Sequence, residues 1–328
     1  MHLYWAQFEP ERGKPLTQWK LDAARRLTAD GVKVKGHPLI WHTLAPEWLT
    51  GMDEDGILSE CLARIDRDAS AFRGLIDMWD VINEVVIMPV FDKYDNGITR
   101  LCKKLGRFRT AREMFREAKR ANPDAVLLIN DFNTSQAYEI LIEGLLDEGV
   151  PIDVIGIQSH QHQGFWGAEK LGEVLRRFER FGKPIHFTEN TLVSGHLMPP
   201  EIVDLNDYKV GNWPSTPEGE ARQAQDVYDM YSALFAHPLV EGITSWDFAD
   251  GAWLGAPGGL IRRDGTVKPA YETLYRLING EWHTSLDVVT DGNGMAEING
   301  YRGEYSVTGE GAEGRFTLDR SGSTSCVL

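Results

Sequence analysis

Two glutamates could act together as an acid and a nucleophile. Glu84 ends the segment WDVINE and Glu189 lies near the end of IHFTEN, each after apolar residues typical of a buried strand. In parallel α/β barrels the working side chains lie at the carboxyl ends of strands. Cleaving an acetal by double displacement needs one carboxylic acid and one attacking carboxylate, about 5 to 5.5 Å apart. We interpret Glu84 as general acid/base and Glu189 as nucleophile; the alternative for either is a salt-bridge partner.

A third strand end supplies groups that could assist this pair. In IGIQSHQH the period of two places Gln158, His160 and His162 on one side, where an amide or imidazole could hydrogen-bond the nucleophile. Alternatively, His160 and His162 could be metal ligands, together with His or Asp from other strand ends. The candidates for such further ligands are His37, His42 and His186. We favour a site with no metal and no organic cofactor, and we interpret His186 as structural.

Tryptophans accompany the expected strand ends. Sugar rings present CH faces that stack on indole, so exposed tryptophans near paired carboxylates suit a polysaccharide groove. Trp246 and Trp253 flank the last expected strand and its loop, and we expect both to contact sugar. Core packing is the favoured interpretation for Trp41 and Trp79, while Trp48 follows the first expected strand.

Short apolar runs alternate with amphipathic helical patterns from about residue 18 to 280, which indicates repeated β-α units around a parallel sheet. The six expected strands are Val32 to Trp41, Ile76 to Glu84, Ala125 to Phe132, Ile152 to His160, Pro184 to Asn190 and Val240 to Phe248. A helix is expected to begin near Leu16 or Thr17, and another after Thr216 and Pro217. We predict a (β/α)8 TIM barrel in which the N-terminal strand or strands are absent or nearly so.

The chain changes character after Trp282, where it becomes rich in glycine and short alternating segments. These segments are Ser285 to Thr290, Glu304 to Thr308 and Arg315 to Leu318. We therefore divide the chain into a catalytic barrel, residues 1–281, and a small antiparallel β appendage, residues 282–328.

The composition of the chain argues against some classes of binding partner. The formal net charge of −15 opposes binding to nucleic acid or anionic lipid, and no apolar stretch approaches the roughly 20 residues that cross a bilayer. The three cysteines are too few and too scattered for a disulfide framework. The first residues have no signal-peptide pattern, and the sequence indicates neither the compartment nor the oligomeric state.

Six segments in this order resemble glycoside hydrolase family 10, the endo-β-1,4-xylanase family. They are GHPLIWHTLAPEWL, WDVINE, LLINDFN, IDVIGIQSH, IHFTEN, and GITSWDFADGAW with the following GTVKPAY. The resemblance implies that Glu84 is the acid/base, that Asn83 contacts the sugar 2-hydroxyl, and that His160 supports Glu189 as nucleophile. It also implies substrate binding by His42, Trp48, Gln158, Trp246 and Trp253, and a secreted or periplasmic protein.

The sequence departs from the family pattern in three places. Met1 and Tyr4 stand where the family has an asparagine and a lysine that hold the neighbouring sugar. Glu189-Asn190-Thr191 replaces the usual ELD, and the loop that follows, through Pro214, is long. The family's first strand has no counterpart here, so either the chain is truncated or the barrel is completed in another way.

These residues predict a retaining endo-hydrolase of β-1,4-xylan or a related plant β-glycan. Glu84 should have a raised pKa and Glu189 should be ionised, because the two roles need opposite protonation at one pH. One alternative is a catalytically impaired barrel that binds carbohydrate, and another is a metal-dependent barrel hydrolase using His160 and His162.

Overall fold

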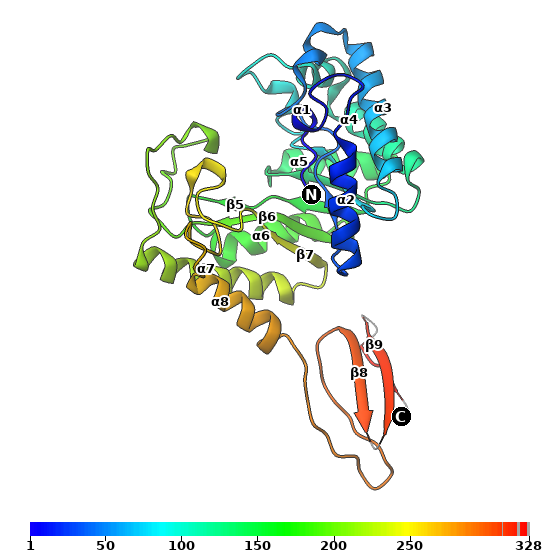
Figure 1. The fold of residues 1–328 in the computed structure, drawn as a ribbon, viewed down its shortest axis with the longest axis vertical. Helices are drawn as coiled ribbons and strands as arrows, with labels where there is room; N and C mark the ends of the chain where they lie inside the picture. The colour runs from blue at the N-terminus through cyan, green and yellow to red at the C-terminus, as the bar shows by residue number, and fades with distance from the viewer. Residues whose placement is uncertain (310, 320–321, 327–328) are drawn as a thin grey trace.

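The computed structural model describes residues 1–309, 311–319 and 322–326, which form a curled parallel sheet surrounded by helices, followed by a separate hairpin (Figure 1). The strands are β1 (Lys35–Gly36), β2 (Met78–Asn83), β3 (Val126–Asp131), β4 (Val154–Ile157), β5 (His160–Gln161), β6 (Ile185–Leu192) and β7 (Val240–Ser245). Their order is β1-β2-β3-β4-β6, with the short β5 pairing with the end of β6 and β7 also pairing with β6. All pairs are parallel, so all strands end at one mouth.

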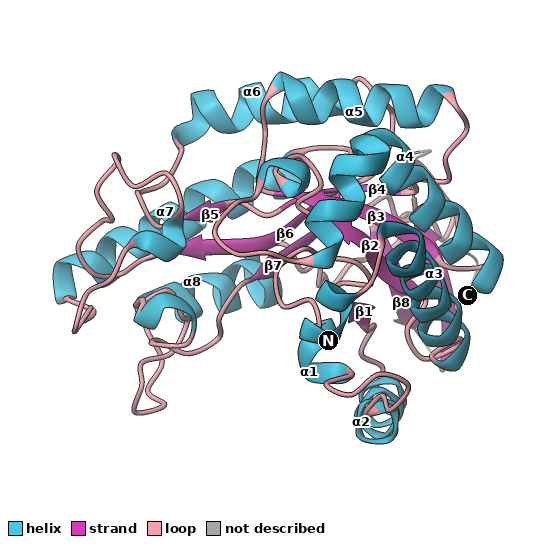
Figure 2. Ribbon diagram, turned by 90° about the horizontal axis from the view of Figure 1, so that it is seen from above, coloured by secondary structure: helices cyan, strands magenta, loops and turns pink. Residues whose placement is uncertain are grey.

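Helices alternate with the strands and cover the outside of the sheet (Figure 2). They are α1 (Trp5–Phe8), α2 (Thr17–Ala29), α3 (Glu54–Ala71), α4 (Gly97–Ala121), α5 (Gln136–Asp147), α6 (Gly167–Glu179), α7 (Pro217–Ala236) and α8 (Pro269–Arg276). Single helical turns add η1 (Glu47–Gly51), η2 (Met88–Val90), η3 (Leu205–Asp207), η4 (Trp253–Gly255) and η5 (Leu277–Glu281). The predicted start of α7 is confirmed, because the Thr216 side chain accepts the Gly219 N–H and Pro217 opens the helix.

The main core lies between the sheet and its helices, and it fixes close approaches between neighbouring strands. Trp79 on β2 is fully buried, as predicted, and its indole donates to the carbonyl of Ile76. A Cβ on Gly36 of β1 would lie 2.3 Å from this indole ring, so only glycine lets the two strands pack here.

The first strand is shorter than predicted. The sequence indicates a strand from Val32 to Trp41, but its pairing with β2 is confined to Lys35–Gly36 and one further bridge between Ile40 and Ile82. Pro38 lies between these two pairings and has no N–H to give to a ladder, which explains the interruption. All six predicted strands exist in the predicted order, and the predicted barrel architecture is confirmed.

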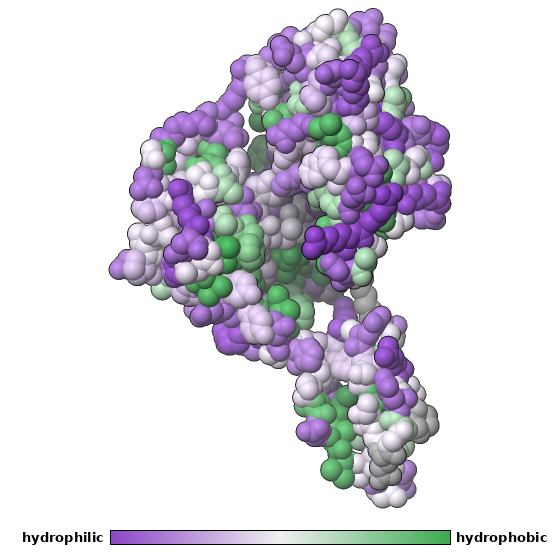
Figure 3. All heavy atoms as spheres, viewed as in Figure 1, coloured by the Kyte–Doolittle hydropathy of each residue, from purple (hydrophilic) through white to green (hydrophobic). Residues whose placement is uncertain are grey.

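The sheet is open on one side. Residues 1–3 run beside β1, where Leu3 N–H donates to the His37 carbonyl and His37 N–H to that of Met1. Among the described residues, β7 pairs with β6 alone and its side chains are only partly buried. Figure 3 shows this side hollowed, with apolar residues inside. At the mouth the two edges approach through the rings of His2 and Trp246, with centroids 5.0 Å apart.

The C-terminal appendage is an antiparallel hairpin of β8 (Gly303–Gly309) and β9 (Ala312–Leu318). The prediction of a strand at Ser285 to Thr290 is wrong: this segment is an exposed loop that forms no ladder with any described residue. Contacts with the barrel include Trp282, which stacks on Phe235 of α7 at 4.1 Å. In the described part of the chain, no helix is long and apolar enough to cross a membrane.

Candidate active site

Glu84 directly follows β2 and has a positive φ of 56°. Such a conformation is unusual for a residue with a side chain and is found at functional sites. Its carboxylate accepts hydrogen bonds from Trp41 Nε1 at 2.8 Å and Gln158 Nε2 at 3.2 Å. Burial raises the pKa of Glu84 to about 8, and the negative charges of Asp131 and Glu189 add to this rise. The two hydrogen-bond donors lower the pKa but do not outweigh burial. Glu84 is therefore protonated at neutral pH, as an acid catalyst must be.

Glu189 is a buried residue of β6 whose environment favours the opposite charge state. One oxygen accepts from Asn130 Nδ2 at 2.8 Å, and the other lies 3.1 Å from His160 Nε2. The His37 ring nitrogen lies 4.0 Å from the first oxygen. Burial alone would raise the pKa of Glu189, but His37 and His160 outweigh it and the pKa is lowered. Glu189 is thus ionised when Glu84 is protonated.

Amide side chains connect the two carboxylates. Asn83 Oδ1 accepts from both Gln158 Nε2, at 3.1 Å, and Asn130 Nδ2, at 2.8 Å. Gln158 also donates to Glu84, and Asn130 also donates to Glu189. The chain of bonds from one glutamate to the other therefore crosses β2, β3 and the end of β4. It holds both carboxylates in fixed orientations.

A buried ion-pair group lies behind Glu189. Asp80 Oδ2 is 2.7 Å from Lys35 Nζ and 2.7 Å from His37 Nδ1. Burial raises the pKa of Asp80, but Lys35 and His37 outweigh it and bring the pKa to about 2. His37, which the sequence offered as a possible metal ligand, thus lies between Asp80 and Glu189.

Aromatic rings surround the carboxylates on the open side of the sheet. The ring of Trp253 lies 4.6 Å from that of His160, and Trp246 lies 5.6 Å from His37. The interpretation of Trp41 as core packing is wrong, because its half-buried indole bonds Glu84. Tyr4 also lines the site, 5.7 Å from the Trp41 ring. The alignment with the family's lysine was the one signal in the sequence that could have found Tyr4.

Three singled-out residues lie apart from the carboxylates. Trp48 packs on Trp5 and donates to the Glu9 carbonyl at 3.2 Å, so its role in binding substrate stays a prediction. His42 is buried 4.6 Å from the Phe91 ring, and burial lowers its pKa to about 4. Ser159 has a φ of 57°, which breaks the strand period, and the His162 ring lies beside the site residues, 6.0 Å from that of His160 and 5.1 Å from that of Trp253.

Both ring nitrogens of buried His162 lack a hydrogen-bond partner, and burial lowers the pKa of its ring to about 3. His160 uses its ring nitrogens for Thr191 and Glu189. Within the described ranges, no group of three or more His, Cys, Asp or Glu side chains is placed to hold a metal ion.

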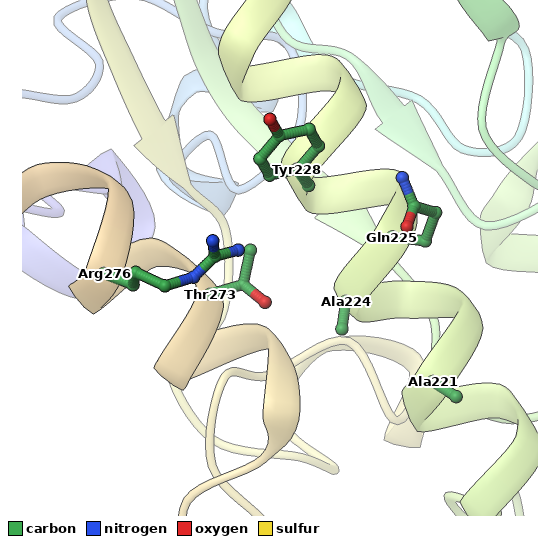
Figure 4. Close-up of a pocket in the computed structure, with 6 residues that line it drawn as sticks. All are labelled: Ala221, Ala224, Gln225, Tyr228, Thr273 and Arg276. Carbon is green, nitrogen blue, oxygen red and sulfur yellow. The ribbon is translucent and has the colours of Figure 1, made fainter. Parts of the chain in front are cut away.

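Two hollows lie away from the paired glutamates. One of about 310 Å³ between α7 and α8 is lined by Ala221, Ala224, Gln225, Tyr228, Thr273 and Arg276 (Figure 4). It contains no carboxylate. The other, of about 390 Å³, is lined by residues 208–211 and Leu254, next to the sugar-contact candidate Trp253.

Comparison with known proteins agrees with this arrangement. The family model described as glycosyl hydrolase family 10 matches residues 2–276. Endo-1,4-beta-xylanase B of Thermotoga neapolitana is 32% identical over 264 residues, which cover 75% of this chain and 67% of that protein. Xylanase 10B from Thermotoga maritima has a similar structure, with a TM-score of 0.68 at 25% identity over 84% of each chain.

Two other relatives extend well beyond the matched region. Anti-sigma-I factor RsgI6 of Acetivibrio thermocellus is 25% identical over 323 residues, covering 94% of this chain and 38% of that protein. The beta-1,4-xylanase of Dictyoglomus thermophilum is 29% identical over 239 residues, which cover 69% of this chain and 63% of that protein. The chain thus spans less than two thirds of the length of both proteins.

Proposed function

We propose, from the premise that the chain belongs to glycosyl hydrolase family 10, that it cleaves internal linkages of β-1,4-xylan or a related plant β-glycan with retention. One observation carries the proposal: Glu84, which follows β2, and Glu189 of β6 are joined by amide hydrogen bonds and have pKa values displaced in opposite directions. Glycosidases that work by double displacement need one protonated and one ionised carboxyl group at the same pH.

In the first step Glu84 gives its proton to the leaving glycosidic oxygen while a Glu189 oxygen attacks the anomeric carbon. Asn130 and His160 hold Glu189 in position for attack, and Trp41 and Gln158 hold Glu84. In the second step the ionised Glu84 takes a proton from water, and that water releases the sugar from Glu189. Both inversions occur at one carbon, so the configuration is retained.

The choice of xylan rests on the relatives. Several are named xylanases, and a structure titled as a xylanase A mutant in complex with xylopentaose is 25% identical with a TM-score of 0.69. Trp246 and Trp253 offer faces on which sugar rings can stack. Tyr4 and Met1 take the places of polar family residues, so recognition of the neighbouring sugar should differ from that family pattern. Secretion or a periplasmic location stays a prediction from the resemblance.

The test is reducing-sugar release from xylan, cellulose and mixed-linkage glucan, with the anomer of the first product followed by NMR. We expect xylan to be cut with retention, and both Glu189→Gln and Glu84→Gln to lose several orders of magnitude in kcat/KM. Glu173→Gln, an exposed change on α6, is the matched control and should retain full activity. Inversion of configuration, or an active Glu189→Gln variant, would contradict the mechanism.

A second candidate is a barrel that binds glycan without cleaving it. One observation favours it: the sheet is open, and β7 has one strand neighbour among the described residues. A wild-type protein that binds a glycan in calorimetry, yet releases no sugar from any of the three polymers, would support this candidate.

A further inference from the structure

Two loops at the mouth of the barrel are joined by an ion-pair cluster that the proposed chemistry does not use. Lys93 Nζ lies 2.7 Å from Asp204 Oδ2 and 2.5 Å from Asp207 Oδ1. We call these three residues the clasp. Lys93 belongs to the loop of residues 91–96, which follows β2 and Glu84, whereas the two aspartates belong to the loop of residues 193–215, which follows β6 and Glu189. In Figure 1 these cyan and green loops approach each other from opposite halves of the molecule.

The loop that carries Lys93 is packed against His42, whose ring lies 6.2 Å from that of Trp41, the residue that hydrogen-bonds Glu84. The Phe91 ring lies 4.6 Å from that of His42 and 4.9 Å from that of Tyr94. The loop ends at Asn96, whose side chain accepts the Thr99 N–H at 2.8 Å and caps α4. Lys93 is therefore presented from a loop fixed at both ends, next to the residues around Glu84.

The loop that carries the aspartates has a small core of its own. Trp213 is buried with Val193 and Met198, and its indole donates to the His196 carbonyl at 2.9 Å. Gln163, which follows β5, donates to the carbonyls of Pro199 and Ile202. The long loop is therefore an ordered wall of the mouth, and the clasp connects it to the opposite wall.

The clasp itself is weakly held. The side chains of Lys93, Asp204 and Asp207 retain 38%, 34% and 62% of their exposure. Ion pairs this exposed contribute little net stability and weaken as salt is added. Opening the clasp therefore costs little, while the packed bases of both loops stay in place.

We propose that the clasp limits access of long glycan chains to the paired carboxylates. When closed, the clasp connects the loop that follows Glu84 to the loop that follows Glu189. A polymer chain then cannot enter the mouth of the barrel from the side. A short oligosaccharide enters the mouth of the barrel whether the clasp is open or closed. The inference rests on the proposed glycan hydrolysis and adds a preference between substrates of different length.

The test compares kcat/KM for a soluble, uncharged arabinoxylan with that for an aryl β-xylobioside. In Lys93→Met the ratio of polymer to short substrate should rise by up to about fivefold, which corresponds to about 1 kcal/mol. The triple charge swap Lys93→Asp, Asp204→Lys and Asp207→Lys should return the ratio toward that of wild type. Lys104→Met on α4, which removes an exposed pair with Asp55 of α3, is the matched control and should leave the ratio unchanged.

Salt gives a second readout. At 1 M NaCl the wild-type ratio should approach that of Lys93→Met, and the ratio of the variant should barely change. An unchanged ratio in Lys93→Met would overturn the clasp, and a lower ratio would make Lys93 a polymer-binding residue instead. If wild type cleaves neither substrate, the proposed function fails on its own. The clasp is then judged by the association rate of arabinoxylan, which must be faster for Lys93→Met than for wild type.

Discussion

The two sides of the barrel differ in how completely the sheet is paired. On β2, β3, β4 and β6 nearly every residue is buried and each strand has neighbours on both sides. On β7 the side chains are at least partly exposed, as are Met1 and His2, and β7 and residues 1–3 each have one pairing partner among the described residues. The carboxylates and their amide network lie on the closed side, while His2, Tyr4 and Trp246 line the open side. The closed side thus supplies most of the burial that sets the charge states, and the open side supplies aromatic faces that border the carboxylates.

The largest effect should come from Glu189, the proposed nucleophile, on the closed side. Glu189→Gln keeps the shape but removes the attacking charge, and should lower kcat by at least about 10³-fold. Stopped-flow assays with an aryl xylobioside measure it. Trp246→Ala on the open side should mainly raise KM. If both variants lose kcat equally, the proposed division between the sides is wrong.

The second largest loss of activity should come from breaking the amide network between the two carboxylates. Asn130→Ala removes a donor to Glu189 and leaves buried groups unpaired, so kcat should fall by about 10²-fold through misplaced carboxylates. Asn279→Ala, at an exposed position in η5, is the control and should have no effect on kcat. A normal kcat in Asn130→Ala would show that His160 alone positions the nucleophile.

Core substitutions compare the two sides directly. Ile129→Ala on β3 empties a fully buried site and should cost about 2–5 kcal/mol of unfolding free energy. Ile243→Ala on β7, which is only partly buried, should cost less than about 2 kcal/mol. Urea unfolding followed by tryptophan fluorescence gives both values. Equal losses would mean that β7 is covered in solution.

The pH profile of kcat/KM tests the environment of Glu84. Activity requires protonated Glu84 and ionised Glu189, so it should fall above about pH 8 and also at acid pH, where Glu189 is protonated. Trp41→Phe removes a donor that lowers the pKa of Glu84, so the alkaline limb should move up. Asp131→Asn removes a nearby negative charge and should move it down. Shifts in the opposite directions would refute the assignment.

The smallest effect concerns stability. The pKa of Glu84 is higher in the folded than in the unfolded chain. The contribution of protonated Glu84 to the free energy of unfolding is therefore complete below about pH 4.5 and is lost as the pH rises toward 8. Glu84→Gln cannot ionise and should exceed wild type in Tm at pH 8 by at least about 2 °C, with a smaller difference at pH 5. Scanning calorimetry with Glu173→Gln as control checks this. A gap that does not change with pH would contradict burial as the cause.

The sequence by itself determined the alternation of strands and helices, the start of α7 at Thr216 and the positions of both glutamates at strand ends. These features depend on local patterns: apolar runs, capping residues and segments that can be compared with a family. The same local evidence could not locate interruptions such as the positive φ at Ser159 or the loop at Ser285 to Thr290, because those depend on which segments pair.

Only the tertiary structure decided which polar groups meet. Trp41 and Glu84 are 43 positions apart in the chain, Asn130 and Glu189 are 59 apart, and Lys93 and Asp207 are 114 apart. Whether a carboxyl group is protonated depends on the sum of burial and charges from all such neighbours. The identity of a residue and its local spacing do not contain that sum, because it exists only once distant strands lie side by side.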